Sequence, residues 1–235
     1  MRAQVFLDAC AGKGEDQIYS ASVHIVEGLY LCDYVPCTPE HKMEFALAVS
    51  RDGLNFTRVK NGQRTLPVGP PGSWDSGYVF HAWPERDGDI LRTYYTATTC
   101  HHGTDDLAYP AIQLGLATIR ANGWTFWTPR PDHDRGTVTT IPIRSSAGAR
   151  KGLTVNLEGA AGKAGAFAVE VLDAATRKPI QGFAAAECLA PKSDGLAAPV
   201  AWKAGPTLPA GGDIRLRFHL RARGVRLYSF GFRNV

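Results

Sequence analysis

The feature that most constrains the fold is an order of short strand-like runs that occurs twice in the first half of the chain. Each copy has two runs joined by a tight turn, a loop that carries cysteine and histidine, and two more runs joined at "SRDG" or "RANG". The runs are rich in β-branched and aromatic residues and are bounded by Gly, Pro and Asp. No stretch shows the apolar period of an amphipathic helix. The sequence therefore predicts an all-β protein.

The repeated unit is a four-stranded antiparallel meander, which is typical of a β-propeller blade. The predicted strands of the two copies are 18–26, 29–35, 44–50 and 55–59, then 77–83, 90–97, 112–119 and 124–128. Closed propellers have about four to eight blades, so two blades do not close a ring. We therefore expect residues 1–130 to form a partial β-propeller with open strand edges.

A second series of strands begins after Pro129. Gly- and Pro-rich turns separate six more predicted strands, namely 136–143, 152–159, 166–173, 198–205, 214–221 and 225–232. This pattern is typical of a β-sandwich, which we expect in residues 131–235.

Residues 214–221 alternate between apolar and mainly basic side chains. The apolar side chains predict a face that packs on the core of the sandwich. The other face is a basic stripe of Arg215, Arg217, His219 and Arg221. This stripe is either a solvated sheet face or a surface for an anionic glycan or a partner.

Composition and charge disfavour several classes of function. The 235 residues carry a net charge of +4, and the basic residues are scattered, so we expect no nucleic-acid surface. The five cysteines form no CxxC pair, so neither a zinc ribbon nor a redox motif is indicated. Without an apolar run long enough for a signal peptide or a membrane span, we expect a cytoplasmic protein that binds no membrane. A secreted location stays open if the chain is a fragment of a longer protein.

Four stretches carry a resemblance to a known family, namely "LAVSRDGLNFTRV", "GPPGSWDSGYVF", "GDILRTYYTATTCHHG" and "LGLATIRANGWTFW". They resemble the later blades of five-bladed β-propeller glycoside hydrolases of the invertase, arabinanase and furanosidase type. In those relatives a β-sandwich follows, and residues 136–232 are similar to it. The resemblance implies the C-terminal part of such a hydrolase, with its last two blades plus the sandwich, and a carbohydrate or other small-molecule substrate.

The chain departs from this family at the catalytic residues. The relatives usually carry an acid and a base on earlier blades, and this sequence has neither an "NDPNG"-like nor an "RDP" motif. Either the chain is a fragment, or copies of it assemble. Since an open edge strand invites pairing, we expect a homo-oligomer, either a dimer or a trimer.

The candidate site lies at the predicted rim, where the loop after the second strand of each blade meets the residues before the first strand. The rim candidates are Asp16, Cys37, His41, Asp75, Cys100, His101, His102 and Asp105. Asp75 and Asp16 could act as acid and base in glycoside cleavage, and His102 is a further catalytic candidate.

Aromatic residues near the predicted rim are candidates for contact with a sugar. Trp74 and Tyr78 are the expected substrate-binding residues. Trp83, Tyr94 and Tyr95 either stack on sugar rings or belong to the blade core, because they follow the strand period.

The histidines offer a second kind of site. Three neutral imidazoles with one open position suit a catalytic zinc ion, which lowers the pKa of its bound water to about 7. His24 and His81 are expected on the channel-facing side of adjacent strands, and His101 or His102 could complete the set. The alternative is that these histidines are hydrogen-bonded residues of a sugar-binding groove.

Three functions follow from these candidates. The first is a hydrolase related to the propeller glycoside hydrolases, truncated to two blades and oligomeric. The second is a zinc-dependent hydrolase of phosphoesters or activated esters. The third is a non-catalytic carbohydrate-binding protein.

Overall fold

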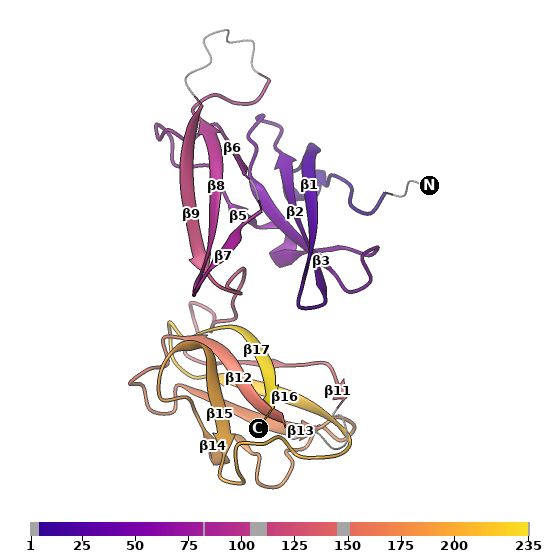
Figure 1. Ribbon diagram of the computed structural model, residues 1–235, viewed down its shortest axis with the longest axis vertical. Coiled ribbons are helices and arrows are strands. Elements are labelled where there is room, and N and C mark those ends of the chain that lie inside the picture. Colours follow the sequence, from indigo (N-terminus) through magenta and orange to yellow (C-terminus); the bar gives the residue numbers. More distant parts are fainter. Residues whose placement is uncertain (1–4, 82, 104–111, 145–150, 235) are drawn as a thin grey trace. The chain divides into compact units, whose positions relative to one another are not determined.

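The computed structural model describes residues 5–81, 83–103, 112–144 and 151–234 (Figure 1). Regular structure in these residues consists of strands and three short 3-10 helices, η1 (Ala11–Lys13), η2 (Val59–Gly62) and η3 (Ala185–Glu187), which confirms the all-β prediction. None of these described helices is long and apolar enough to cross a membrane. The chain divides into two compact units, Met1–Ile119 and Arg120–Val235.

The first sheet of the first unit follows the predicted meander. Its strands are β1 (Gln17–Val26), β2 (Leu29–Cys37), β3 (Phe45–Ser50) and β4 (Thr57–Arg58), and β5 (Arg64–Leu66) pairs with a further part of β3. Glu27 and Gly28, with φ values of 51° and 79°, make the two-residue turn between β1 and β2. At "SRDG", the Asp52 carboxylate accepts hydrogen bonds from the amides of Leu54 and Asn55, which closes the turn after β3.

The second sheet contains β6 (Tyr78–His81), β7 (Glu85–Asp87), β8 (Ile90–Thr98) and β9 (Gln113–Arg120). β6 and β7 pair with the two halves of β8 along the same edge of the sheet. The predicted fourth strand, 124–128, is wrong. Trp127 instead exchanges two backbone hydrogen bonds with Leu227 in the second unit, and neither sheet closes among the described residues of the first unit.

The two sheets of the first unit share a hydrophobic core. β2 is buried from Leu31 to Cys37, whereas β1 and β9 are edge strands with several exposed apolar side chains. A parallel bridge between Met43 and Tyr78 links the two sheets. The shared cluster consists of Val35, Cys37, Met43, Phe45, Val79, Tyr95 and Ala97. Because both sheets contribute side chains to this cluster, their burial stabilises the packing of one sheet against the other.

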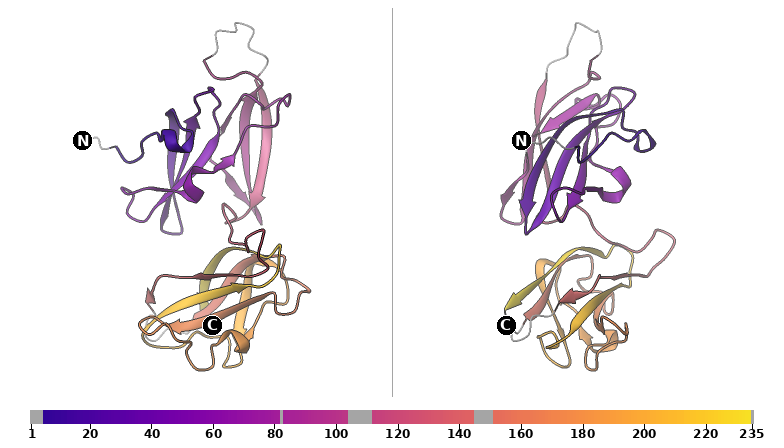
Figure 2. Two further views of the ribbon diagram at one scale, coloured as in Figure 1. Left: turned by 180° about the vertical axis from the view of Figure 1, so that it is seen from behind. Right: turned by 90° about the vertical axis from the view of Figure 1, so that its right-hand side faces the viewer.

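The second unit has two sheets around one core, as expected of a β-sandwich (Figure 2). One sheet has the order β14 (Cys188–Leu189), β15 (Gly195–Trp202), β12 (Lys151–Glu158), β17 (Arg226–Asn234). In the other, β16 (Asp213–Leu220) lies between β13 (Phe167–Asp173) on one side and β10 (Gly136–Thr139) with β11 (Ile143–Arg144) on the other. The alternation predicted in 214–221 is present, since the apolar side chains of β16 are buried and the others are partly exposed. The division between units lies at Ile119, before the expected boundary at 130.

Candidate functional site

Two Cys/His-bearing loops meet at one end of the first unit. Gln17 at the start of β1 lies opposite Cys37 at the end of β2, and Tyr78 at the start of β6 lies opposite Thr98 at the end of β8. In each hairpin, the loop that follows the second strand therefore lies beside the start of the first strand. The backbone amide of His102 donates a hydrogen bond to the carbonyl oxygen of His41 at 2.9 Å. We call this region, formed by residues 38–44 and 99–103 with the residues before β1 and β6, the loop end.

His102 packs against two tyrosine rings at the loop end. Its ring centroid is 4.5 Å from that of Tyr19 and 6.0 Å from that of Tyr78, and both contacts are edge-on. Phe80 packs edge-on against Tyr19 at a centroid distance of 6.1 Å. Because Tyr19 is 48% exposed, its ring remains accessible to a ligand. We call Tyr19, Tyr78, Phe80 and His102 the aromatic cluster.

Gly77 allows this close approach of loop and strand. A Cβ atom at residue 77 would lie 1.9 Å from the carbonyl oxygen of Cys100, which no side chain permits. The amide of Gly77 donates to the carbonyl oxygen of Thr98 at 2.9 Å. Gly103, the residue after His102, adopts a left-handed backbone conformation with a φ of 70°. Gly77 therefore brings the loop against β6, and Gly103 allows the chain to turn after His102.

Asp75 is held by two hydroxyl groups. Ser73 Oγ donates to Oδ1 of Asp75 at 2.7 Å, and the phenol of Tyr95 donates to Oδ2 at 3.2 Å. Burial, and then the charge of Asp75, raise the pKa of Tyr95, so this phenol remains a donor. Trp74 stacks on Tyr95 with ring centroids 5.4 Å apart. Trp74, Asp75 and Tyr95 thus form one packed group beside the loop end.

Asp16 is the more accessible of the two predicted carboxylates. It is exposed directly before β1, and its backbone amide donates to the carbonyl oxygen of Cys37 at 2.8 Å. Burial, and then the charge of Asp16, raise the pKa of Cys37, which keeps this thiol protonated. A protonated thiol is a poor nucleophile, so Cys37 is not a good candidate for covalent catalysis.

The histidines of the expected zinc site have partners of other kinds. The imidazole of His24 stacks on Trp83 with ring centroids 3.8 Å apart. A hydrogen bond from Thr38 is the largest cause that lowers the pKa of Glu40, and the charges of Lys42 and then His101 lower it further. The side chain of His81 and the whole of Asp105 lie outside the described residues.

Within the part of the chain that is described, no group of three or more His, Cys, Asp or Glu side chains could hold a metal ion. These residues give no fit to a zinc ion, and the set of His24, His81 and His101 stays a prediction.

Two members of the aromatic cluster, Tyr19 and Phe80, were missing from the candidates drawn from the sequence. A signal for Tyr19 exists, because "DQIY" and "DSGY" place a tyrosine three residues after Asp16 and after Asp75. Both tyrosines pack on the same imidazole. Phe80 has no such signal, since its contact with Tyr19 depends on how β1 and β6 face each other.

Comparisons with known proteins find partial similarities of structure. No protein-family model matches the chain, and no curated protein matches it. A solved structure of a glycoside hydrolase is similar at a TM-score of 0.36 and 20% identity, over 43% of this chain and 32% of that chain. An N-acetylgalactosamine deacetylase from F. plautii in complex with blood group B trisaccharide is similar at a TM-score of 0.34 and 20% identity, over 51% of this chain and 37% of that one. The chain spans about a third of the length of these two structures.

Proposed function

We propose that the protein is a carbohydrate-active hydrolase that binds its substrate at the loop end of the first unit. The observation that carries this proposal is the half-exposed ring of Tyr19, which packs against the imidazole of His102. A tyrosine ring offers an apolar face to the C–H groups of a sugar and a hydroxyl group for hydrogen bonding. An adjacent imidazole adds a group that can donate or accept a proton near neutral pH.

In this proposal the two carboxylates have different roles. Asp16 is exposed and can approach a bound glycoside as the group that exchanges a proton with the leaving oxygen. Asp75, held by Ser73 and Tyr95, is the fixed carboxylate that would act as base or nucleophile. Glycoside hydrolysis requires two carboxyl groups about 5–9.5 Å apart on opposite sides of the scissile bond.

The test measures binding and hydrolysis on the same samples. Binding of neutral oligosaccharides such as arabinan and fructan fragments is followed by calorimetry for the natural chain and for Tyr19→Ala. We expect Tyr19→Ala to weaken binding at least tenfold, which corresponds to the loss of about 1.4 kcal/mol of stacking free energy. Trp127→Ala is the control, because Trp127 is a 62% exposed aromatic residue that belongs to the second unit, and it should leave the affinity within twofold.

Activity then separates the three functions. Loss of hydrolysis in Asp16→Asn and Asp75→Asn, with binding retained, would support the glycoside hydrolase. Binding without hydrolysis in every sample would leave the carbohydrate-binding protein. Hydrolysis of phosphoesters that requires zinc and disappears in His24→Ala would support the metal-dependent enzyme instead.

We also propose that copies of the chain associate through the open edges of the first unit. β9 exposes apolar side chains on one face, with Leu114 at 80% and Leu116 at 49% exposure. β1 exposes Val23 and Ile25 in the same way. Exposed apolar residues on an unpaired edge strand favour pairing with another copy. A mass measurement in solution should therefore give a dimer or a trimer.

A further inference from the structure

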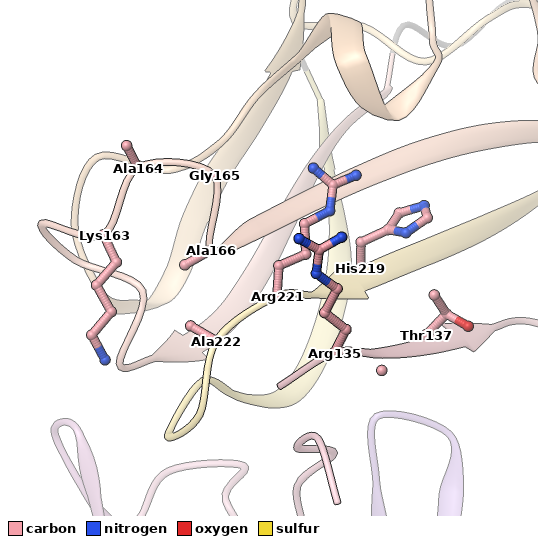
Figure 3. A pocket seen from close by; sticks show the side chains of 10 residues that line it. Arg135, Thr137, Lys163, Ala164, Gly165, Ala166, His219, Arg221 and Ala222 are labelled. Atoms are coloured by element: carbon pink, nitrogen blue, oxygen red, sulfur yellow. The ribbon is translucent and has the colours of Figure 1, made fainter. Parts of the chain in front are cut away.

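An open cavity of about 610 Å³ lies in the second unit, and none of the residues that line it belongs to the loop end. Three segments surround it: the chain entering β10, the end of β16, and the loop of residues 163–166. Its size lies in the range of cavities that bind small molecules. The side chains that line it include Arg135, Lys163, His219 and Arg221 (Figure 3).

Strand pairing fixes the position of these segments. Gly136 lies opposite Leu220, and Thr137 lies opposite His219, which sets Arg135 beside the end of β16. The backbone amide of Arg221 donates to the carbonyl oxygen of Ala166 at 2.7 Å, which anchors the loop on the other side. The guanidinium groups of Arg135 and Arg221 are directed the same way in Figure 3, whereas the amine of Lys163, on the loop of residues 163–166, is directed away from them.

Other basic residues of β16 already have partners within the protein. Arg217 Nη1 lies 2.9 Å from Oε1 of Glu170, and His219 Nε2 lies 3.2 Å from the same oxygen. Arg215 donates to the carbonyl oxygens of Thr140 and Ala174. Most of the basic stripe is therefore engaged by the protein itself.

Three other cations line the cavity, and one of them, Arg221, is the last member of the stripe. Among the described residues, no carboxylate forms an ion pair with Arg135, Lys163 or Arg221. Glu170 does not line the cavity. All three residues are exposed, so solvent screens their charges. The two guanidinium groups of Arg135 and Arg221, without a carboxylate partner, still produce a local positive potential that favours an anion.

We propose that this cavity binds a tetrahedral oxyanion, either a phosphate or a sulfate group. A guanidinium group donates two parallel hydrogen bonds to such a group. Two guanidinium groups at the ends of neighbouring strands, directed the same way, offer four such bonds, which suits the several oxygen atoms of a tetrahedral group better than the two oxygens of a planar carboxylate. The group can be an inorganic ion or an ester carried by a saccharide. The site is independent of the aromatic cluster, so the failure of either proposal leaves the other untouched.

Calorimetric titration of the full chain at low salt tests the site with five probes. They are inorganic phosphate, inorganic sulfate, a sulfated disaccharide, its unsulfated counterpart and a hexuronate. The variants are Arg221→Ala and Arg135→Ala. Arg223→Ala is the matched control, because it removes the same charge nearby from an exposed arginine that is paired with Asp134 at 2.8 Å and does not line the cavity.

We expect phosphate or sulfate to bind, Arg221→Ala and Arg135→Ala to weaken that binding at least tenfold, and Arg223→Ala to change it less than twofold. Tenfold tighter binding of the sulfated disaccharide than of sulfate, with no binding of the unsulfated one, would assign the group to a saccharide. Similar affinity for sulfate and for the sulfated disaccharide would assign the site to the free ion. No binding, an equal effect of Arg223→Ala, or a preference for the hexuronate would overturn the proposal.

Discussion

Replacing Glu15 tests whether a buried ion pair holds the N-terminal segment of the first unit. The side chain of Glu15 is fully buried and accepts hydrogen bonds from three groups. Arg58 Nη2 lies 2.6 Å from its Oε2, the phenol of Tyr34 donates to Oε1 at 2.8 Å, and the amide of Cys10 donates to Oε2 at 3.1 Å. These bonds connect the residues before β1 to β2 and β4.

The expected cost of Glu15→Ala follows from the groups that lose their partner. The buried phenol of Tyr34 would be left without its acceptor, which costs about 1–3 kcal/mol. The guanidinium of Arg58 would lose its charge partner, and breaking a buried pair in this way costs about 3–5 kcal/mol. Arg58 keeps some contact with solvent, so the two effects do not add fully. We therefore expect a loss of about 3–5 kcal/mol from the free energy of unfolding of the first unit.

The effect should depend on pH with a definite sign. Burial alone would raise the pKa of Glu15, but hydrogen bonds from Arg58 and Tyr34 lower it below its ordinary value of 4.5. A carboxyl group with a lowered pKa in the folded state stabilises the fold above its unfolded pKa. That contribution is lost as the pH falls through the folded pKa. The difference between the natural chain and Glu15→Ala should thus be full at pH 7 and shrink below pH 4.5.

Urea unfolding followed by circular dichroism measures this difference, with separate transitions fitted if the two units unfold independently. Asp87→Asn is the control, because Asp87 forms an exposed ion pair with Arg92 at 2.8 Å in the same unit. Loss of this exposed ion pair should lower the free energy of unfolding by less than about 1 kcal/mol. A loss below 1 kcal/mol for Glu15→Ala at pH 7, or a difference that grows as the solution is acidified, would show that the Glu15 ion pair does not hold this segment.

Three more changes test other parts of the structure. Gly77→Ala should cost at least about 3 kcal/mol in urea unfolding, because its Cβ would meet the backbone carbonyl group of Cys100. Gly12→Ala, with open space around it, should cost far less. Asp194→Ala should lower the unfolding free energy of the second unit by about 1–3 kcal/mol, since its carboxylate accepts from three successive amides beginning at Gly159; an unchanged midpoint would contradict this. Leu114→Asp should shift the mass in light scattering toward the monomer, and a mass that stays unchanged would show that this edge is not the contact.

Local patterns in the sequence sufficed for most strands of this protein. Alternation of apolar and basic side chains predicted the two faces of β16, and the repeated order of runs predicted the hairpins of both sheets in the first unit. The pattern failed at 124–128, where a strand-like run pairs with β17 instead of completing the second sheet. Periodicity reports which face of a run is buried, but it does not identify the strand with which the run will pair.

The candidate site was only partly accessible from sequence for the same reason. The repeat placed the two Cys/His-bearing loops in corresponding positions, but the contact of Tyr19 and Phe80 depends on how β1 and β6 face each other. The oxyanion site depends even more on tertiary structure, because Arg135, Lys163 and Arg221 come from three distant segments. Local patterns of residues are enough to establish that the chain is all-β, where most strands run and which faces are apolar. Which side chains meet follows from the folded structure alone, because pairing between distant strands depends on how whole faces pack together.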